Sequence, residues 1–290
     1  MNSNHPLVTC RIFGQMGNQL YQIAATLAYA WDYDAIPIFP ELHKQEDRIS
    51  YNRDRIFFRL DTSNPTRPFR NIFQESSFCS SKRVPFRVDQ ILCGYFQSWR
   101  HFHHHRDRIL SILAPTQSIE QKLLNKYGDL INKPNTIAVH VRTFSKHLHE
   151  NKLHPFIGFE YYQKALEFFP KDSELVVFSD RINWCKMNFV KEFDRKMTFI
   201  EGNDNVEDFF LMSKMKHNII ANSTFSWWGS YFNQNQNKIV VAPKYAPYFD
   251  SKFPLSDFYL NDWITLPVNV DSPYPVDMEC YNDLFQSLNG

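Results

Sequence analysis

The stretch Asn222-Ser223-Thr224-Phe225-Ser226-Trp227-Trp228-Gly229 begins where a run rich in apolar residues, 218–221, ends. The run is typical of a buried strand, and the aromatic residues after the small polar ones are typical of a packed helix. The first backbone N–H groups of such a helix are left uncapped. They point to the same spot as the positive end of the helix dipole. Ser223, Thr224 and Ser226 add hydroxyl donors there. The stretch therefore predicts an anion site, with an ordinary N-cap above a packed tryptophan pair as the alternative.

Apolar runs alternate with helical patterns along most of the chain. In the N-terminal part we expect a strand at residues 7–13, a turn at 14–19, a helix at 20–31 and a strand at 35–39. In the C-terminal part we expect strands at 136–141, 174–178, 197–200, 217–221 and 238–242, and helices at 159–169, 182–190, 205–215 and 225–232. Continuously apolar strands separated by helices are typical of parallel sheets covered on both faces. The pattern predicts an α/β protein with doubly wound, mostly parallel sheets.

We expect two such domains, because residues 132–135 interrupt the alternation. The N-terminal domain then covers residues 1–134 and the C-terminal domain residues 135–290, with the last helix packing back on the N-terminal domain. Polar clusters follow the predicted strands at residues 14–19, 140–142, 179–180 and 222–226. Ligands of such sheets bind at the carboxyl ends of the strands, so these clusters are expected to line one site. The irregular residues 41–87 are expected to shape the binding of a second substrate.

Size, charge and cysteine content narrow the classes of function. The chain has 290 residues, 43% of them hydrophobic, and a formal net charge of +1. No overall field attracts it to nucleic acid or an anionic membrane, so an anion site has to be local. The five cysteines form no C-x-x-C pair, which predicts reduced thiols. Residues 1–9 lack a signal pattern and no apolar run approaches the about 18 residues of a membrane span, so we expect a soluble, cytoplasmic protein of unknown oligomeric state.

Arg142 ends a predicted buried strand. A guanidinium at that place costs free energy unless it meets an anion, and a diphosphate is a natural partner. An ion pair with a nearby carboxylate is the alternative. His140 lies two residues earlier on the same strand face, either as a wall of the site or as a core histidine.

Gly17 lies in the polar cluster that follows the first predicted strand. Without a Cβ it lets the backbone approach a ligand closely. Asn18 and Gln19 then offer amide donors and acceptors at the mouth of the site. A turn glycine followed by an asparagine helix cap is the alternative.

Two patterns resemble metal sites, and we expect neither to be one. Asp32-Tyr33-Asp34 is similar to the D-x-D clamp of many sugar transferases, but it follows a predicted helix at the edge opposite the polar clusters. The run His101-Phe102-His103-His104-His105 contains no carboxylate or cysteine that completes a set of ligands, and Arg106 and Arg108 repel a cation. A solvated helix end and a solvated basic surface are therefore predicted, with no metal required.

Several short segments match one known family in order. They are G-Q-M-G-N-Q-L-Y-Q at 14–22, G-Y-F-Q-S at 94–98, F-S-D with W-C within 178–185, the region 209–233 and A-P-K at 242–244. In these segments the chain resembles glycosyltransferase family 11, the α-1,2-fucosyltransferases, in its soluble bacterial form. The matching pieces span residues 14–244, which is most of the sequence.

The resemblance implies two Rossmann-like domains facing a cleft, the GT-B type. It also implies GDP-fucose as donor, a glycan acceptor, no cofactor or metal, and inversion at the fucose anomeric carbon, with the 2-hydroxyl of a galactoside as acceptor group. By the same resemblance Asn18 lies near the reacting centre and Gly17 near the phosphates. The donor is expected to contact, in addition, His140, Arg142, Asp180, Asn222, Ser223, Thr224 and Phe225. We assign Asn18 and Arg142 as catalytic residues; Asp180 reads the guanine or ribose, or else caps the next helix.

One segment departs from the family. The family carries H-x-R-R-x-D on the strand that opens the donor domain, where this chain has His140-Val141-Arg142-Thr143-Phe144-Ser145. Thr143 replaces the second arginine and Ser145 the aspartate. The departure leaves open an altered donor, an altered acceptor or a weak enzyme. It also motivates a different class, a protein that binds a nucleotide sugar or glycan without transferring it.

The acceptor hydroxyl has to lose a proton, so transfer needs a general base. No residue can be assigned to this role from the sequence. His147, His149, Glu150 and His154 follow the altered segment as candidates, each of them also typical of a solvated loop. A related transferase that uses another GDP-sugar, such as GDP-mannose, is a further alternative.

Overall fold

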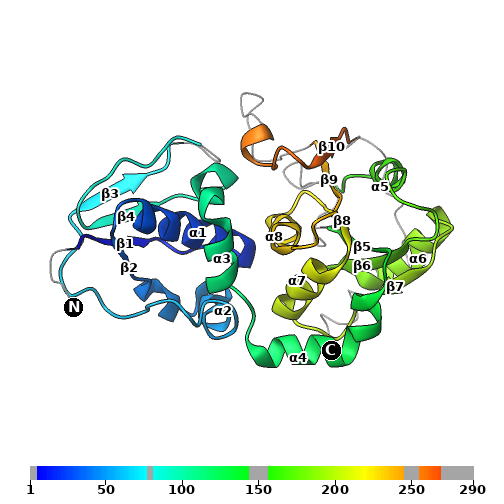
Figure 1. Ribbon diagram of the computed structural model, residues 1–290, viewed down its shortest axis with the longest axis horizontal. Coiled ribbons are helices and arrows are strands. Elements are labelled where there is room, and N and C mark those ends of the chain that lie inside the picture. Colours follow the sequence, from blue (N-terminus) through cyan, green and yellow to red (C-terminus); the bar gives the residue numbers. More distant parts are fainter. Residues whose placement is uncertain (1–4, 77–80, 144–155, 245–254, 269–290) are drawn as a thin grey trace, which may run out of the picture.

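The computed structural model describes residues 5–76, 81–143, 156–244 and 255–268. Its strands form two sheets, and all pairings in both are parallel. The parallel α/β character predicted from the alternating pattern is therefore confirmed. Figure 1 shows the N-terminal strands (blue to cyan) on the left and the C-terminal strands (green to orange) on the right.

The N-terminal sheet has the strand order β2-β1-β4-β3. Its strands are β1 (Leu7–Cys10), β2 (Ile36–Pro37), β3 (Asn71–Gln74) and β4 (Gln90–Cys93), and its helices are α1 (Met16–Asp32) and α2 (Ile49–Arg55). Helix α1 starts four residues earlier than predicted, so Gly17 and Asn18 lie in its first turn and Gln15 takes the N-cap position. The interpretation of Gly17 as a turn glycine and Asn18 as a cap is wrong. Gly14, with φ of +75°, is the glycine of the turn.

The C-terminal sheet has six strands in the order β10-β9-β8-β5-β6-β7. The strands are β5 (Thr136–Val141), β6 (Glu174–Ser179), β7 (Met197–Phe199), β8 (His217–Ile219), β9 (Val240–Pro243) and β10 (Ile264–Leu266). The helices between them are α5 (Phe159–Leu166), α6 (Ile182–Glu192), α7 (Asn205–Lys214) and α8 (Thr224–Phe232). Every residue of β5 is buried, as expected for a strand covered on both faces.

Two short 3-10 turns and two helices connect the sheets. They are η3 (Trp99–His101), η4 (His103–His105), α3 (Arg106–Ile112) and α4 (Gln117–Asn132). Helix α4 ends at the stretch predicted as a domain boundary, and it contacts α7 of the C-terminal half. A continuous cluster of buried apolar residues extends from α1 through Phe102 to Trp227 and Trp228 of α8. The two halves therefore share a core.

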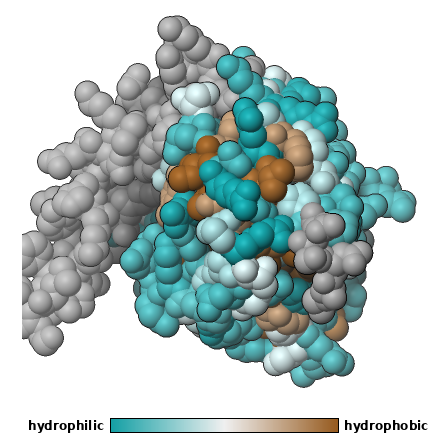
Figure 2. Space-filling model, turned by 90° about the vertical axis from the view of Figure 1, so that its left-hand side faces the viewer, coloured by the Kyte–Doolittle hydropathy of each residue, from teal (hydrophilic) through white to brown (hydrophobic). Residues whose placement is uncertain are grey.

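The outer face of the N-terminal half is mostly hydrophilic, with a small group of hydrophobic atoms at its surface (Figure 2). The most exposed hydrophobic side chain in this half is Ile72, which is 68% exposed on β3 at the edge of the sheet. Short edge strands such as the four residues of β3 offer little template for pairing with another chain. None of the described helices is long and apolar enough to cross a membrane. Cys10, Cys93 and Cys185 are free thiols, and burial raises the pKa of Cys10 to about 12.

Candidate active site

The first turns of α1 and α8 touch each other. A Cβ placed on Gly17 would lie 2.5 Å from Thr224 Oγ1 and 2.8 Å from the backbone carbonyl carbon of Thr224. The Thr224 hydroxyl donates a hydrogen bond of 3.3 Å to Asn18 Oδ1. The structure therefore brings Gly17 and Asn18 together with Thr224, which lies about two hundred residues later in the sequence. The space that we expected Gly17 to leave for a ligand is filled by Thr224.

A third segment orients the side chain of Asn18. Gln97, in the G-Y-F-Q-S motif, donates from Nε2 to Asn18 Oδ1 at 2.9 Å. Since Gln97 and Thr224 both donate to Oδ1, the amide NH₂ of Asn18 points the other way, where it lies 2.7 Å from the position of a Cβ on Gly14. The motif signalled Gln97, but sequence reasoning gave it no role.

The segment that carries Gln97 is held by Glu75. Glu75 Oε2 accepts hydrogen bonds from the backbone N–H groups of Tyr95 at 2.8 Å and Phe96 at 3.0 Å. Phe96 adopts a φ of +52°, an unusual conformation for an aromatic residue. These two bonds stabilise the bend that brings Gln97 to α1.

Helix α8 begins at Thr224, one residue before the predicted start, and its N-terminus is capped. Ser223 is the N-cap, and its hydroxyl accepts a hydrogen bond of 3.3 Å from the N–H of Phe225. Ser226 is buried and donates to the carbonyl oxygen of Ser223. The expectation of an uncapped turn is therefore wrong, and the hydroxyls of Ser226 and Thr224 already donate within the protein. The Ser223 O–H, the first-turn N–H groups in general and the helix dipole remain as anion-binding features, whereas the Thr224 O–H is already donated to Asn18.

Arg142, Thr143 and Asp180 form a group at the carboxyl ends of β5 and β6. Arg142 Nη1 lies 3.3 Å from Asp180 Oδ2, so the ion pair considered as an alternative is present. Asp180 Oδ1 accepts from the Thr143 N–H at 3.0 Å and the Thr143 hydroxyl at 3.2 Å. Asp180 does not cap α6, because Arg181 occupies the N-cap position. A guanidinium carries five N–H donors, so this ion pair is compatible with a second anionic partner.

His140 forms a buried, neutral wall beside the start of α8. Its ring lies 5.5 Å from the ring of Phe225, and the residue is 5% exposed. Burial, and then the positive charge of Arg142, lower the pKa of His140 from 6.5 to about 3. Among the described residues, Nδ1 of His140 has no hydrogen-bond partner. Asn222, directly before the N-cap of α8, is also buried.

The first turn of α8 thus links two groups of predicted site residues. Thr224 contacts Gly17 and Asn18 of the N-terminal half, and Phe225 contacts His140 of the C-terminal half. The candidate bases His147, His149, Glu150 and His154, and also Ser145, lie outside the described residues.

The two carboxylates of the D-x-D pattern have different partners. Helix α1 ends at Asp32, one residue beyond the predicted end. Asp34 lies 3.2 Å from His5, whereas Asp32 contacts His104 and His105. The two carboxylates therefore do not share a partner. Our statement that no carboxylate completes the histidine run is wrong, because Asp32 supplies one.

Residues 69–267, more than half of the chain, match the family model described as "Glycosyl transferase family 11". The chain belongs to glycosyltransferase family 11. It is 32% identical to the O-antigen biosynthesis glycosyltransferase WbnK of Escherichia coli in an alignment 205 residues long that covers 65% of this chain and 65% of WbnK. It is 28% identical to an alpha-1,2-colitosyltransferase of Escherichia coli, over 84% of this chain and 93% of that protein.

The fold is similar to solved fucosyltransferase structures. A structure of NodZ alpha-1,6-fucosyltransferase soaked with GDP-fucose aligns with a TM-score of 0.54 at 12% identity, covering 79% of this chain and 93% of NodZ. A FUT1 mutant of Arabidopsis thaliana in complex with GDP aligns with a TM-score of 0.52 at 10% identity, covering 83% of this chain and 71% of FUT1. At these identities the similarity concerns the fold alone.

Proposed function

We propose that this member of family 11 transfers fucose from GDP-fucose to a hydroxyl of a glycan acceptor, the 2-hydroxyl of a galactoside, with inversion and without a metal. The observation that carries the proposal is the combination of the first turn of α8, which contacts His140, with Arg142, whose side chain is 36% exposed and whose charge acts on the same histidine. In this proposal residues 1–134 form an acceptor-side domain and residues 135–290 a donor domain, arranged as in GT-B enzymes. The two parallel sheets support this division.

In the proposed mechanism the chain stabilises the departing diphosphate electrostatically. Charge develops on the leaving oxygen as the glycosidic bond breaks, and fixed dipoles and cations aimed at it lower the barrier. The positive end of α8 and the guanidinium of Arg142 have this role. Each charge-assisted hydrogen bond contributes about 1.5–3 kcal/mol. His140 stays neutral and excludes water, since its pKa is lowered to about 3.

Asn18 and Asp180 have positioning roles in this mechanism. The amide of Asn18 is fixed by Gln97 and Thr224, so its NH₂ can orient a sugar or phosphate oxygen without first being ordered. Asp180 holds Arg142 at the end of β5, and we keep it as the candidate for contact with the nucleoside. The general base stays unassigned.

The direct test is a donor and acceptor panel. Purified protein is incubated with GDP-fucose and galactose-terminated acceptors, and the linkage of each product is determined. GDP-mannose tests another GDP-sugar, and nucleotide-activated colitose tests the donor suggested by the name of the colitosyltransferase relative. Transfer of fucose to the galactose 2-hydroxyl supports the proposal. Nucleotide binding without GDP release from any donor would instead support the non-catalytic alternative.

The role of Arg142 is tested by Arg142→Ala. The variant should lose transfer and GDP affinity with little loss of fold stability, because the side chain is 36% exposed. Arg67→Ala is the matched control, since Arg67 forms an ion pair of 2.9 Å with Asp89, which precedes the inner strand β4 and so lies at the amino ends of the N-terminal sheet. GDP binding by Arg142→Ala as tight as by Arg67→Ala, measured by calorimetry, would remove Arg142 from the site.

Transfer should continue in excess chelator, because a helix N-terminus and a guanidinium take the place of a divalent cation. The measurement is the transfer rate with EDTA and after addition of Mn²⁺. Loss of turnover in EDTA that Mn²⁺ restores would contradict the metal-independent mechanism.

A further inference from the structure

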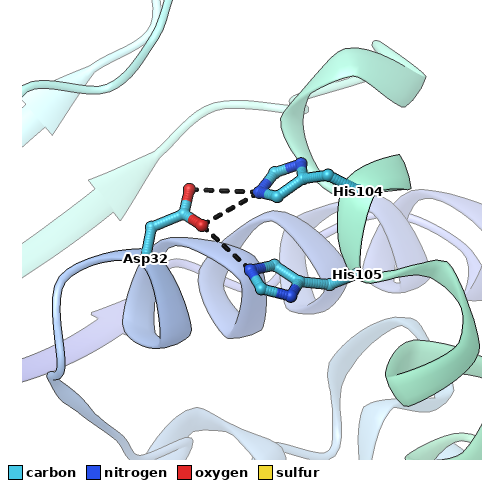
Figure 3. A group of neighbouring side chains, drawn as sticks. All are labelled: Asp32, His104 and His105. Atoms are coloured by element: carbon cyan, nitrogen blue, oxygen red, sulfur yellow. Dashed lines mark hydrogen bonds and ion pairs between the residues drawn. The ribbon is translucent and has the colours of Figure 1, made fainter.

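Three side chains from two distant segments meet at the far end of α1. Asp32 is the last residue of α1, and His104 and His105 lie in η4, just before α3. His104 Nε2 lies 2.9 Å and 3.2 Å from the two carboxylate oxygens of Asp32, and His105 Nε2 lies 2.9 Å from Oδ1 (Figure 3). One ligand atom from each side chain falls within 4.8 Å of the others.

The donor set is suited to a transition metal. Two imidazole nitrogens and one carboxylate oxygen match the ligands of Zn²⁺ sites, in which metal–ligand distances are about 2.0–2.2 Å and water completes the coordination. Hard cations such as Mg²⁺ and Ca²⁺ prefer sites built of oxygen alone. The side chains of Asp32 and His105 are each 25% exposed and that of His104 is 48% exposed, so a cation and its water can reach the group.

The neighbouring arginines are held by other partners. The guanidinium of Arg106 donates to the carbonyl oxygen of Tyr231 at 2.8 Å. The guanidinium of Arg108 lies 3.9 Å from the centre of the Trp31 ring, and that ring contacts His105 edge-on. These contacts fix the positions of the two guanidinium groups, and the carboxylate of Asp32 offsets one of their two positive charges.

We propose that Asp32, His104 and His105 form a site for one Zn²⁺ or a similar imidazole-preferring divalent cation. The bound ion ties the end of α1 to the segment that leads into α3. That segment also contacts α8, because Phe102 stacks on Trp228 at 5.2 Å and Arg106 binds the carbonyl oxygen of Tyr231. The site therefore stabilises the joint between the two halves.

The site is remote from the candidate active site. Helix α1 rises about 22 Å between Gly17 and Asp32, at about 1.5 Å per residue. Cation binding at Asp32 is therefore compatible with transfer that needs no metal at the reacting atoms, and only an EDTA effect that persists in Asp32→Asn would contradict the metal-independent mechanism.

The test uses the full chain without a histidine tag, stripped of metal and titrated with Zn²⁺ against a chromophoric chelator. The wild type should bind one equivalent more tightly than Asp32→Asn, His104→Gln or His105→Gln, each weaker by about tenfold or more. Zn²⁺ should raise the unfolding temperature of the wild type, as a ligand of the folded state does, and Mg²⁺ should not.

His5→Gln is the matched control. His5 Nδ1 lies 3.2 Å from Asp34 Oδ2, so this pair has the same chemistry without a third ligand. His5→Gln should bind Zn²⁺ as the wild type does. The proposal would be overturned if all three site variants bound Zn²⁺ with wild-type affinity or if the wild type bound none. An equal loss of Zn²⁺ affinity in His5→Gln would also overturn it. Co²⁺ absorption of the wild type, which requires no variant to fold, should show nitrogen and oxygen ligands; the spectrum of the hydrated ion would also overturn it.

Discussion

Alanine at Gly17 should separate α1 from α8. A Cβ there would lie 2.5 Å from Thr224 Oγ1, 2.8 Å from Thr224 Cβ and 2.8 Å from the backbone carbonyl carbon, whereas ordinary contact begins near 3.4 Å. Rotation of the Thr224 side chain can move only Oγ1. The backbone of α8 therefore has to retreat by about 0.6 Å, because close-packed groups cannot overlap.

The expected loss can be estimated from this overlap. Overpacking of a well-packed contact costs about 1–3 kcal/mol, against a gain of about 0.8–1 kcal/mol from replacing a helical glycine with alanine. Gly128, in the middle of α4, is the matched control because a Cβ added there would have no atom within 4 Å. Gly128→Ala gains the helix propensity without the overlap. The propensity gain is common to both variants, so their free energies of unfolding should differ by the overlap cost, about 1–3 kcal/mol.

The same displacement should reduce transfer. Misplacement of catalytic groups by about 1 Å can cost about a hundredfold in rate, so kcat/KM of Gly17→Ala should fall by up to this factor. Unfolding free energies come from urea titration, and rates from GDP release with acceptor present. Adding Thr224→Ala should recover only part of the loss, since the backbone carbon stays in place. Identical stability and rate in Gly17→Ala and Gly128→Ala would refute the tight contact between α1 and α8.

Two further changes test the C-terminal half. Thr143→Val removes the hydroxyl that donates to Asp180, so the free energy of unfolding and the free energy of GDP binding should each fall by about 1.5–3 kcal/mol. Thr143→Ser keeps the hydroxyl and should leave both free energies unchanged. Burial raises the pKa of Asp208 from 3.8 to about 6, so wild-type stability should fall by up to about 3 kcal/mol as the pH rises from 4 to 6 and stay constant above that. Asp208→Asn should remove this fall in urea titrations at several pH values; an unchanged slope would contradict the pKa shift.

Five of the six strands of the C-terminal sheet, β5 to β9, could be predicted because each lies in a short run rich in apolar residues, whereas β10 was missed. Residues 136–141 were expected as a strand and form β5, every residue of which is buried. Strand β3 was missed because its four residues alternate between half-buried and exposed and are held by pairing with β4, a contact remote in sequence. Helix α4 was missed too, although its buried residues Ile119, Leu123 and Leu130 form the one-sided apolar pattern typical of a surface helix.

The early start of α1 shows why local patterns misplace a helix boundary. Glycine and asparagine disfavour helix interiors, so residues 14–19 looked like a turn. In the structure Asn18 lies in the first helical turn, where Gln97 and Thr224 bind its side chain. Contacts from two remote segments override the local preference. The group formed by Asp32 and His104 was hidden for the same reason, because the two residues are 72 positions apart.

The contact between α1 and α8 limits the conclusions about activity that follow from the motifs this chain shares with its family. Gly17 and Thr224 lie in two different family motifs, and they touch each other directly. Packing alone therefore requires glycine at position 17, whether or not the protein transfers a sugar. The guanidinium of Arg142, 36% exposed, is not demanded by packing in this way. It follows that retention of the glycine cannot separate a transferase from a binding protein, whereas the response of GDP release to Arg142→Ala can.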